Sequence, residues 1–180
     1  LNNNPSIICL DNDGVIKWQK ELIGDGYDFI SHVQLSNLGS TFVAITTESP
    51  SLSIDEDVFV IDNYNKNSFV KGFEDNEDLD LVILELKTAN GNIENKYRIG
   101  SASYDQLTYF SIDNINGDVN LWGNTYGGKE ILINGDKYHS WNDSKSYNSF
   151  ITSIDKNGLI KLTKSQEEVS LDDQHELGFL

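Results

Sequence analysis

The sequence predicts an all-β fold built from repeated hairpins, and three observations support this prediction. Short runs of β-branched and aromatic residues recur along the chain, separated by clusters of Asp, Asn, Gly and Ser, as is typical of strands joined by tight turns. No long stretch carries apolar residues at helical spacing. Both prolines, Pro5 and Pro50, lie outside the expected strands, where they remove no ladder hydrogen bond.

Three stretches of the chain share one plan of strand, tight turn and strand. They are residues 8–17, 82–94 and 150–161. Their turn glycines, Gly14, Gly91 and Gly158, are 77 and 67 residues apart. Each follows Asp or Asn, and such turns favour these residues because they tolerate positive φ.

A second hairpin follows the first in each of two units. Tyr27-Asp28 precedes it in the first unit and Tyr104-Asp105 in the second, again 77 residues apart. Ile23-Gly24 matches Ile99-Gly100 just upstream, and the second hairpins turn at residues 37–39 and 114–117. Several landmarks at one offset indicate an internal repeat more strongly than any single landmark.

Each unit then carries an insert, at about residues 48–80 and 126–148. Strand-like pieces in the inserts are residues 58–61 with 68–73, and 130–134 with 137–141. We therefore expect a single all-β repeat region over residues 1–180. It holds one unit at about 6–80, a second at about 81–148, and the start of a third at about 149–180.

The composition excludes several classes of function. The chain has 180 residues, 29 of them acidic and 13 basic, for a net charge of −16, with Arg98 as its one arginine. Nucleic acid and anionic membrane surfaces are disfavoured, because both attract clustered Lys and Arg. Apolar runs reach only four residues, so we expect no membrane insertion. Cations, glycans and basic protein surfaces remain as possible classes of partner. The alternative is that the negative charge serves only to keep the protein soluble.

Cys9 is the single cysteine, so no intrachain disulfide forms, and its apolar neighbours favour a buried, inert thiol. The chain contains no Met, and no signal peptide is visible at its start. We therefore expect either a processed chain or an excerpt from a longer polypeptide, and we favour the excerpt.

The second unit resembles the repeat of a bacterial β-propeller family found in surface and secreted proteins. The resemblance rests on residues 99–105, on Phe110-Ser111-Ile112-Asp113, and on residues 116–123. Residues 8–22 also show a weaker similarity to quinoprotein-like propeller repeats, through Leu10-Asp11, Gly14 and Trp18. The match departs from the pattern where Asn95 and Leu162 stand in the place of Trp18.

The resemblance implies four-stranded antiparallel blades, about two and a half of them, with hairpin inserts. That number does not close a propeller ring, so we expect a segment of a larger propeller or an assembly of several chains. It also implies an extracellular or cell-surface location.

Asp11-Asn12-Asp13-Gly14 is the candidate metal site. The carboxylates of Asp11 and Asp13 are hard oxygen ligands suited to Ca²⁺, which takes six to eight of them. The alternative is a hairpin turn stabilised by its own side chains, and the matching turn at residues 155–158 favours this alternative because Lys156 stands in it. No other cofactor is expected.

A second candidate site lies in the second insert, which gathers the aromatic residues Tyr126, Tyr138, Trp141 and Tyr147 beside several asparagines. Aromatic rings next to amides on exposed loops suit sugars or protein surfaces. The alternative is that Tyr138 and Trp141 anchor the insert hairpin onto the blade. His32 matches Tyr109 in the second unit, which indicates a packing position.

The sequence contains no local nucleophile motif, paired metal-ligand motif or phosphate-binding glycine motif. We therefore expect no enzyme and no catalytic residue. The hypothesis is a non-catalytic binding or scaffolding module that contacts protein or glycan through its loops and inserts. The alternatives are an enzyme-associated, quinoprotein-like propeller and a structural subunit of a large assembly, in which other blades or subunits complete the propeller.

Overall fold

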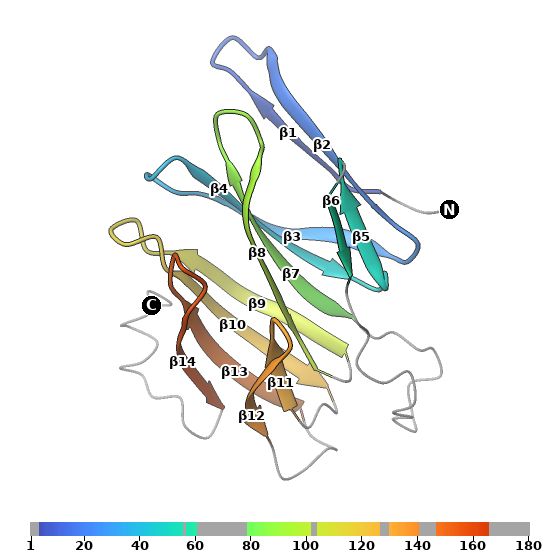
Figure 1. The fold of residues 1–180 in the computed structure, drawn as a ribbon, viewed down its shortest axis with the longest axis vertical. Coiled ribbons are helices and arrows are strands. Elements are labelled where there is room, and N and C mark those ends of the chain that lie inside the picture. Colours follow the sequence, from blue (N-terminus) through green and yellow to red (C-terminus); the bar gives the residue numbers. More distant parts are fainter. Residues whose placement is uncertain are drawn as a thin grey trace.

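All regular secondary structure in the described part of the chain is β-strand, which confirms the all-β prediction (Figure 1). The computed structural model describes residues 4–55, 57–60, 79–101, 104–126, 130–140 and 147–165, and these contain no helix. The strands are β1 (Ser6–Leu10), β2 (Ile16–Gly24), β3 (Asp28–Leu35), β4 (Ser40–Thr47), β5 (Ser51–Ile54), β6 (Asp57–Val60), β7 (Asp80–Lys87), β8 (Ile93–Gly100), β9 (Tyr104–Ile112), β10 (Val119–Tyr126), β11 (Glu130–Ile133), β12 (Asp136–Ser140), β13 (Tyr147–Ile154) and β14 (Ile160–Ser165).

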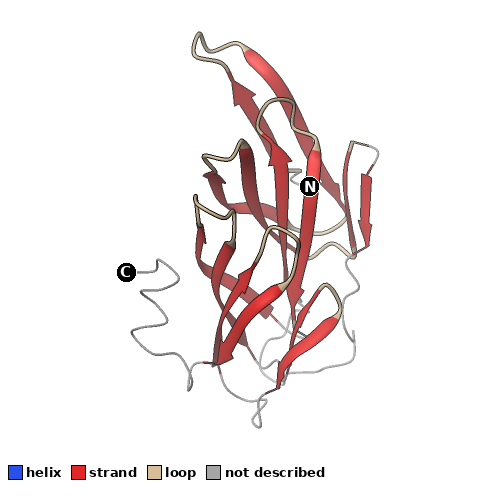
Figure 2. Ribbon diagram, turned by 60° about the vertical axis from the view of Figure 1, so that its left-hand side comes forward, coloured by secondary structure: helices blue, strands red, loops and turns tan. Residues whose placement is uncertain are grey.

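The strands form three antiparallel sheets stacked in layers (Figure 2). The first sheet has the order β1-β2-β5-β6, the middle sheet β12-β11-β8-β7-β4-β3, and the last sheet β14-β13-β10-β9. One core cluster joins the first sheet to the middle sheet, and another joins the middle sheet to the last. The centre of the middle sheet is therefore covered on both faces.

The three hairpins expected from the turn glycines are β1–β2, β7–β8 and β13–β14. Each hairpin has a β-bulge near the start of its second strand, where Lys17, Glu94 and Lys161 are left out of the pairing. The shared bulge aligns the hairpins residue by residue, so the second strands correspond as well. Three residues that the sequence comparison had matched occupy one register position: Trp18, Asn95 and Leu162.

The second hairpins, β3–β4 and β9–β10, also pair alike. A bulge leaves Ser31 out of the first pairing and Thr108 out of the second, and these residues are 77 apart. Residues 77 apart therefore correspond along β3 and β9, including His32 with Tyr109.

The insert hairpins extend the neighbouring sheets. β5–β6 pairs with the outer edge of β2, and β11–β12 pairs with the outer edge of β8. At the junctions Leu22 pairs with Ile54, and Ile99 pairs with Ile133. Strands β7 to β12 therefore repeat the pairing order of β1 to β6.

This register corrects one detail of the sequence interpretation and leaves another untested. Leu22, rather than Ile23, corresponds to Ile99, because these two residues occupy the same place opposite the insert hairpin. The strand expected at 58–61 is β6, and it pairs with β5 directly upstream. Its expected partner, residues 68–73, lies outside the described residues.

Strands β4 and β7 lie at the centre of the molecule. All eight residues of β4 are buried, and its side chains alternate between the two cores. Val43 and Ile45 pack toward the first sheet, whereas Phe42 and Ala44 pack toward the last sheet. Continuous burial of this kind explains why β4 and β7 carry apolar runs without alternation.

Truncating a residue of this centre tests the layered arrangement. Leu84 on β7 is 0 % exposed, and Ile8 takes the same register position on β1 but is 51 % exposed. We expect Leu84→Ala to lower the free energy of unfolding by about 2–5 kcal/mol through lost burial and a cavity. Ile8→Ala should cost less than about 1 kcal/mol. Chemical denaturation of both variants measures the difference, and equal losses would contradict the layering.

Candidate functional site

Five hairpin turns gather at one end of the sheets, here called the turn end (Figure 1). They connect β1–β2, β3–β4, β7–β8, β9–β10 and β13–β14, and each contains a glycine with φ between 72° and 93°. Hydrogen bonds join three of these turns, β3–β4, β7–β8 and β9–β10. Thr88 N donates to Gly39 O at 2.9 Å, and Asn37 N donates to Asn114 Oδ1 at 2.9 Å. These two bonds fix the β3–β4 turn relative to its neighbours.

The candidate metal site at Asp11 and Asp13 lies in the first of these turns. Asp11 Oδ1 accepts hydrogen bonds from Asp13 N and Val15 N, both at 2.9 Å. Asp155 Oδ1 accepts the equivalent pair, from Asn157 N and Leu159 N. Asp11 thus has a turn-stabilising role, as the alternative interpretation expected. Within the described part of the chain, no three His, Cys, Asp or Glu side chains are grouped to hold a metal, and Ca²⁺ binding stays a prediction.

A groove of about 410 Å³ lies at the turn end between three of the turns. Its apolar rim residues are Leu38 and Ile115, from two different turns, and Ile115 is 91 % exposed. Its polar lining residues come from the β9–β10 and β13–β14 hairpins: Asn116, Asp118, Asp155, Lys156, Asn157 and Lys161.

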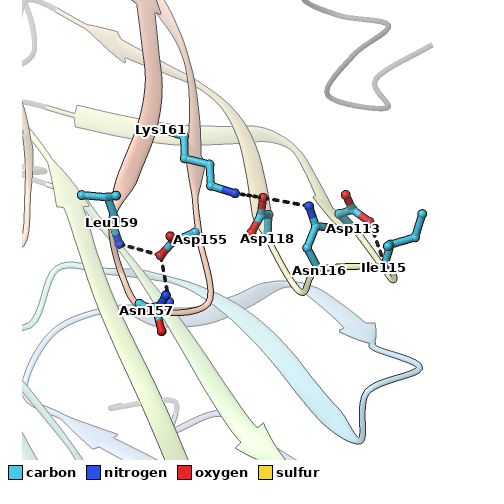
Figure 3. A network of polar contacts seen from close by, with 8 residues as sticks. All are labelled: Asp113, Ile115, Asn116, Asp118, Asp155, Asn157, Leu159 and Lys161. Atoms are coloured by element: carbon cyan, nitrogen blue, oxygen red, sulfur yellow. Dashed lines mark hydrogen bonds and ion pairs between the residues drawn. The ribbon is translucent and has the colours of Figure 1, made fainter.

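Charged side chains join these two hairpins across the groove (Figure 3). Lys161 forms an ion pair with Asp118, which also accepts a hydrogen bond from Asn116 Nδ2. The hydrogen bond to Asp118 raises the pKa of Lys161, so the ammonium stays charged. Backbone hydrogen bonds, that from Leu159 above all, lower the pKa of Asp155. The groove therefore presents fixed charges of both signs beside two exposed aliphatic side chains.

Three of the four aromatic residues predicted as a binding site lie in the described part of the chain, and they are divided between two sheets. Tyr138 lies on β12, at the edge of the middle sheet, and is 39 % exposed. Tyr126 and Tyr147 pair with each other across β10 and β13 in the last sheet, and Tyr126 also pairs with Tyr104. Trp141 lies outside the described residues. The structure thus places Tyr126 and Tyr147 in one row and Tyr138 on a different sheet.

The structure also contains a buried polar cluster that the sequence interpretation missed. Asp105 is fully buried and accepts hydrogen bonds from the backbone and hydroxyl of Ser101, at 2.5 and 3.0 Å. The Ser101 hydroxyl also contacts Thr125 Oγ1 at 2.6 Å. Asp28, at the corresponding position of the first unit, is bound by Thr47 and Ser49. The recurring Asp followed by a strand-ending Thr was the available sequence signal.

Gly100 allows two buried carboxylates to approach each other. A Cβ added at Gly100 would lie 2.0 Å from Asp80 Oδ1 and 3.5 Å from Asp105 Oδ2, so both carboxylates face this one backbone position. Burial raises the pKa of Asp105 well above its ordinary value, and the charge of Asp80 raises it further. Hydrogen bonds from Ser101 and Thr125 act in the opposite direction. Asp105 and its partner Ser101 are both fully buried, and the hydrogen bonds between them connect segments of the interior. We therefore assign Asp105 a structural role.

His32 lies where β3 meets the last sheet. Its ring stands 6.4 Å from that of Phe110, and its Nδ1 is buried without a hydrogen-bond partner. Burial lowers its pKa. These contacts are those of a packed side chain, as the match with Tyr109 predicted.

Comparison with known proteins finds no matching family model, curated protein or solved structure. In the described ranges, no helix has the length and apolar character needed to cross a membrane.

The pH dependence of stability tests the assignment of Asp105. Because its pKa is raised in the folded chain, the folded chain retains a proton that the unfolded chain releases above about pH 4. This group therefore makes the free energy of unfolding fall as pH rises from about 4 toward the folded pKa. We expect Asp105→Asn to flatten that fall, as measured by urea denaturation between about pH 4 and 7.

Asp155→Asn is the matched control, because the pKa of Asp155 is lowered. Its carboxylate stabilises the fold above about pH 4 and loses this effect as pH falls through the lowered pKa. Its removal should therefore leave the slope between about pH 4 and 7 nearly unchanged and alter it only at lower pH. An Asp105→Asn profile parallel to that of the unmodified chain would contradict the assignment.

Proposed function

We propose that this chain is a non-catalytic, protein-binding module of the β-propeller type, whose turn end is the contact surface. In this proposal the three sheets are successive blades, and the setting is a surface or secreted protein, as the sequence resemblance implies. The antiparallel orders β3-β4-β7-β8 and β9-β10-β13-β14 support the blade interpretation, because four-stranded antiparallel sheets stacked face to face are the units of a propeller.

The observation that carries the binding function is the groove between Leu38 and Ile115. Singly exposed aliphatic residues are common and need no explanation. Here two of them, from separate turns, border one groove next to the Lys161–Asp118 ion pair. Apolar contact area next to fixed charges is a combination that protein interfaces use, since the apolar contact supplies affinity and the charges supply specificity.

A protein ligand fits this groove better than a glycan does. Sugars are held by aromatic rings beside amides, and the described groove lining contains amides but no aromatic residue. Glycan binding through the second insert is the second candidate. The row of Tyr104, Tyr126 and Tyr147 favours it, because it aligns three tyrosines across adjacent strands.

The turns suit binding because hydrogen bonds within the protein already fix their conformation in the absence of a ligand. Trp18 Nε1 donates to Thr88 O at 2.9 Å, and Thr88 N in turn donates to Gly39 O. A preorganised surface loses less conformational entropy on binding than a mobile loop does.

Selection of a random cyclic-peptide library against the whole chain tests the proposal. We expect the selected peptides to bind the unmodified chain and to lose at least about tenfold in affinity against Ile115→Asp, because that change places a charge on the apolar rim. Val58→Asp is the control, since Val58 is also an exposed aliphatic residue but lies on β6 and is not part of the groove lining. Peptides that bind both variants equally would exclude the turn end as the contact surface.

A further inference from the structure

The first sheet lacks, among the described residues, two strands that both other sheets possess. In the middle sheet β7 lies between β8 and β4, and in the last sheet β13 lies between β14 and β10. In the first sheet the corresponding strand, β1, pairs with β2 and with no other described strand. The absent neighbours would be a hairpin equivalent to β3–β4 or β9–β10.

A second observation, on a different strand, indicates the same absent hairpin. Val33 pairs with Val43 and therefore lies on the face of the middle sheet that packs against the first sheet. Val33 and Leu35 are nevertheless 56 % and 64 % exposed. Their exposed side chains border the place where the first sheet lacks strands.

The corresponding residues of the last sheet show what covers such positions. Phe110 and Ile112 on β9 correspond to Val33 and Leu35, and both are only 6 % exposed. They share a core with Phe42 and Ala44 of β4. Strand β4 thus has two roles, because it extends the middle sheet beside β7 and it covers the first hairpin of the next sheet.

We propose that the notch formed by the outer edge of β1 and by Val33 and Leu35 binds a two-stranded β-hairpin of the β9–β10 kind by strand addition to β1. One strand of the hairpin pairs antiparallel with Ser6–Leu10, as β4 pairs with β7. Alternate residues of that strand are apolar and cover Val33 and Leu35, as Phe42 and Ala44 cover β9.

The edge of β1 is suited to strand addition. Proteins protect exposed edges with charged side chains, prolines or short strands. Ser6–Leu10 contains no charged residue, and the nearest proline, Pro5, precedes the strand. Main-chain hydrogen bonds to such an edge supply affinity, and the side chains below it select the partner. This inference rests on the correspondence between strands and is independent of what the turn end binds.

The probe for this site is the β9–β10 hairpin itself, residues 104–126, made as a fluorescent peptide. It is suitable because β10 already pairs with β13, the strand equivalent to β1. An isolated hairpin is marginally stable in water, so we would close its ends with a disulfide through Tyr104→Cys and Tyr126→Cys, which pair across the strands. Fluorescence anisotropy against the whole chain should show saturable binding in the micromolar range.

Two readouts locate the site. The double variant Val33→Lys, Leu35→Lys should weaken binding at least about tenfold, because it places two charges under the hairpin. Val58→Lys, an exposed position on β6, should leave binding unchanged. Hydrogen exchange should slow at residues 6–10 when the hairpin binds, and this second readout needs no variant.

The proposal is overturned if the unmodified chain shows no saturable binding up to about 100 µM hairpin. It is also overturned if the double variant binds as well as the control, or if exchange slows at another sheet edge and not at residues 6–10.

Discussion

The burial of β4 and β7 on both faces is the constraint on which the other parts of the structure depend. A sheet with one apolar face needs one neighbour, but a sheet with two apolar faces needs two. The first and last sheets fill these places, and each contributes to a separate core. The layered order of the three sheets follows from this arrangement.

The pairing order of the strands brings the turns together. Strands joined by tight hairpins alternate in direction, so the β3–β4 and β7–β8 turns emerge at the same end of the middle sheet. Because the neighbouring sheets have the same order, their hairpin turns emerge at this end too. The groove between Leu38 and Ile115 exists because two sheets present their turns side by side. Residues 77 apart in the sequence, Asn37 and Asn114, then make the contact that holds these turns together.

Much of this fold could be predicted from the sequence, because its local signals are strong. Tight turns with positive φ select Gly after Asp or Asn, and this preference marked the hairpins around Gly14, Gly91 and Gly158. The 77-residue offset also identified His32 with Tyr109 correctly. The one-residue error at Ile23 arose because Ile-Gly occurs in both units, whereas the register there is set by pairing with the insert hairpin.

The parts that could not be predicted depend on contacts between distant segments. The sequence of β5 does not show that it pairs with β2, because four residues with alternate burial fit any open edge. The Asp105 cluster was missed for a similar reason. Its partners, Ser101 and Thr125, lie on either side of it in the sequence, and only the fold brings both hydroxyls to one carboxylate. The tyrosines of the second insert were grouped by proximity in sequence, and the fold separated Tyr138 from the others.

The outer face of the first sheet has the same pattern of apolar and polar residues as the matching face of the middle sheet. On its outer face Ile8, Leu10 and Ile16 occupy the register positions of residues that are buried or partly buried in the middle sheet: Leu84, Leu86 and Ile93. Its polar residues match as well, since Gln19 and Glu21 stand where Lys96 and Arg98 stand. Two sheets with one polarity pattern are suited to one environment, but no described strand covers this face of the first sheet. The apolar outer face of the first sheet therefore has the composition of a buried layer.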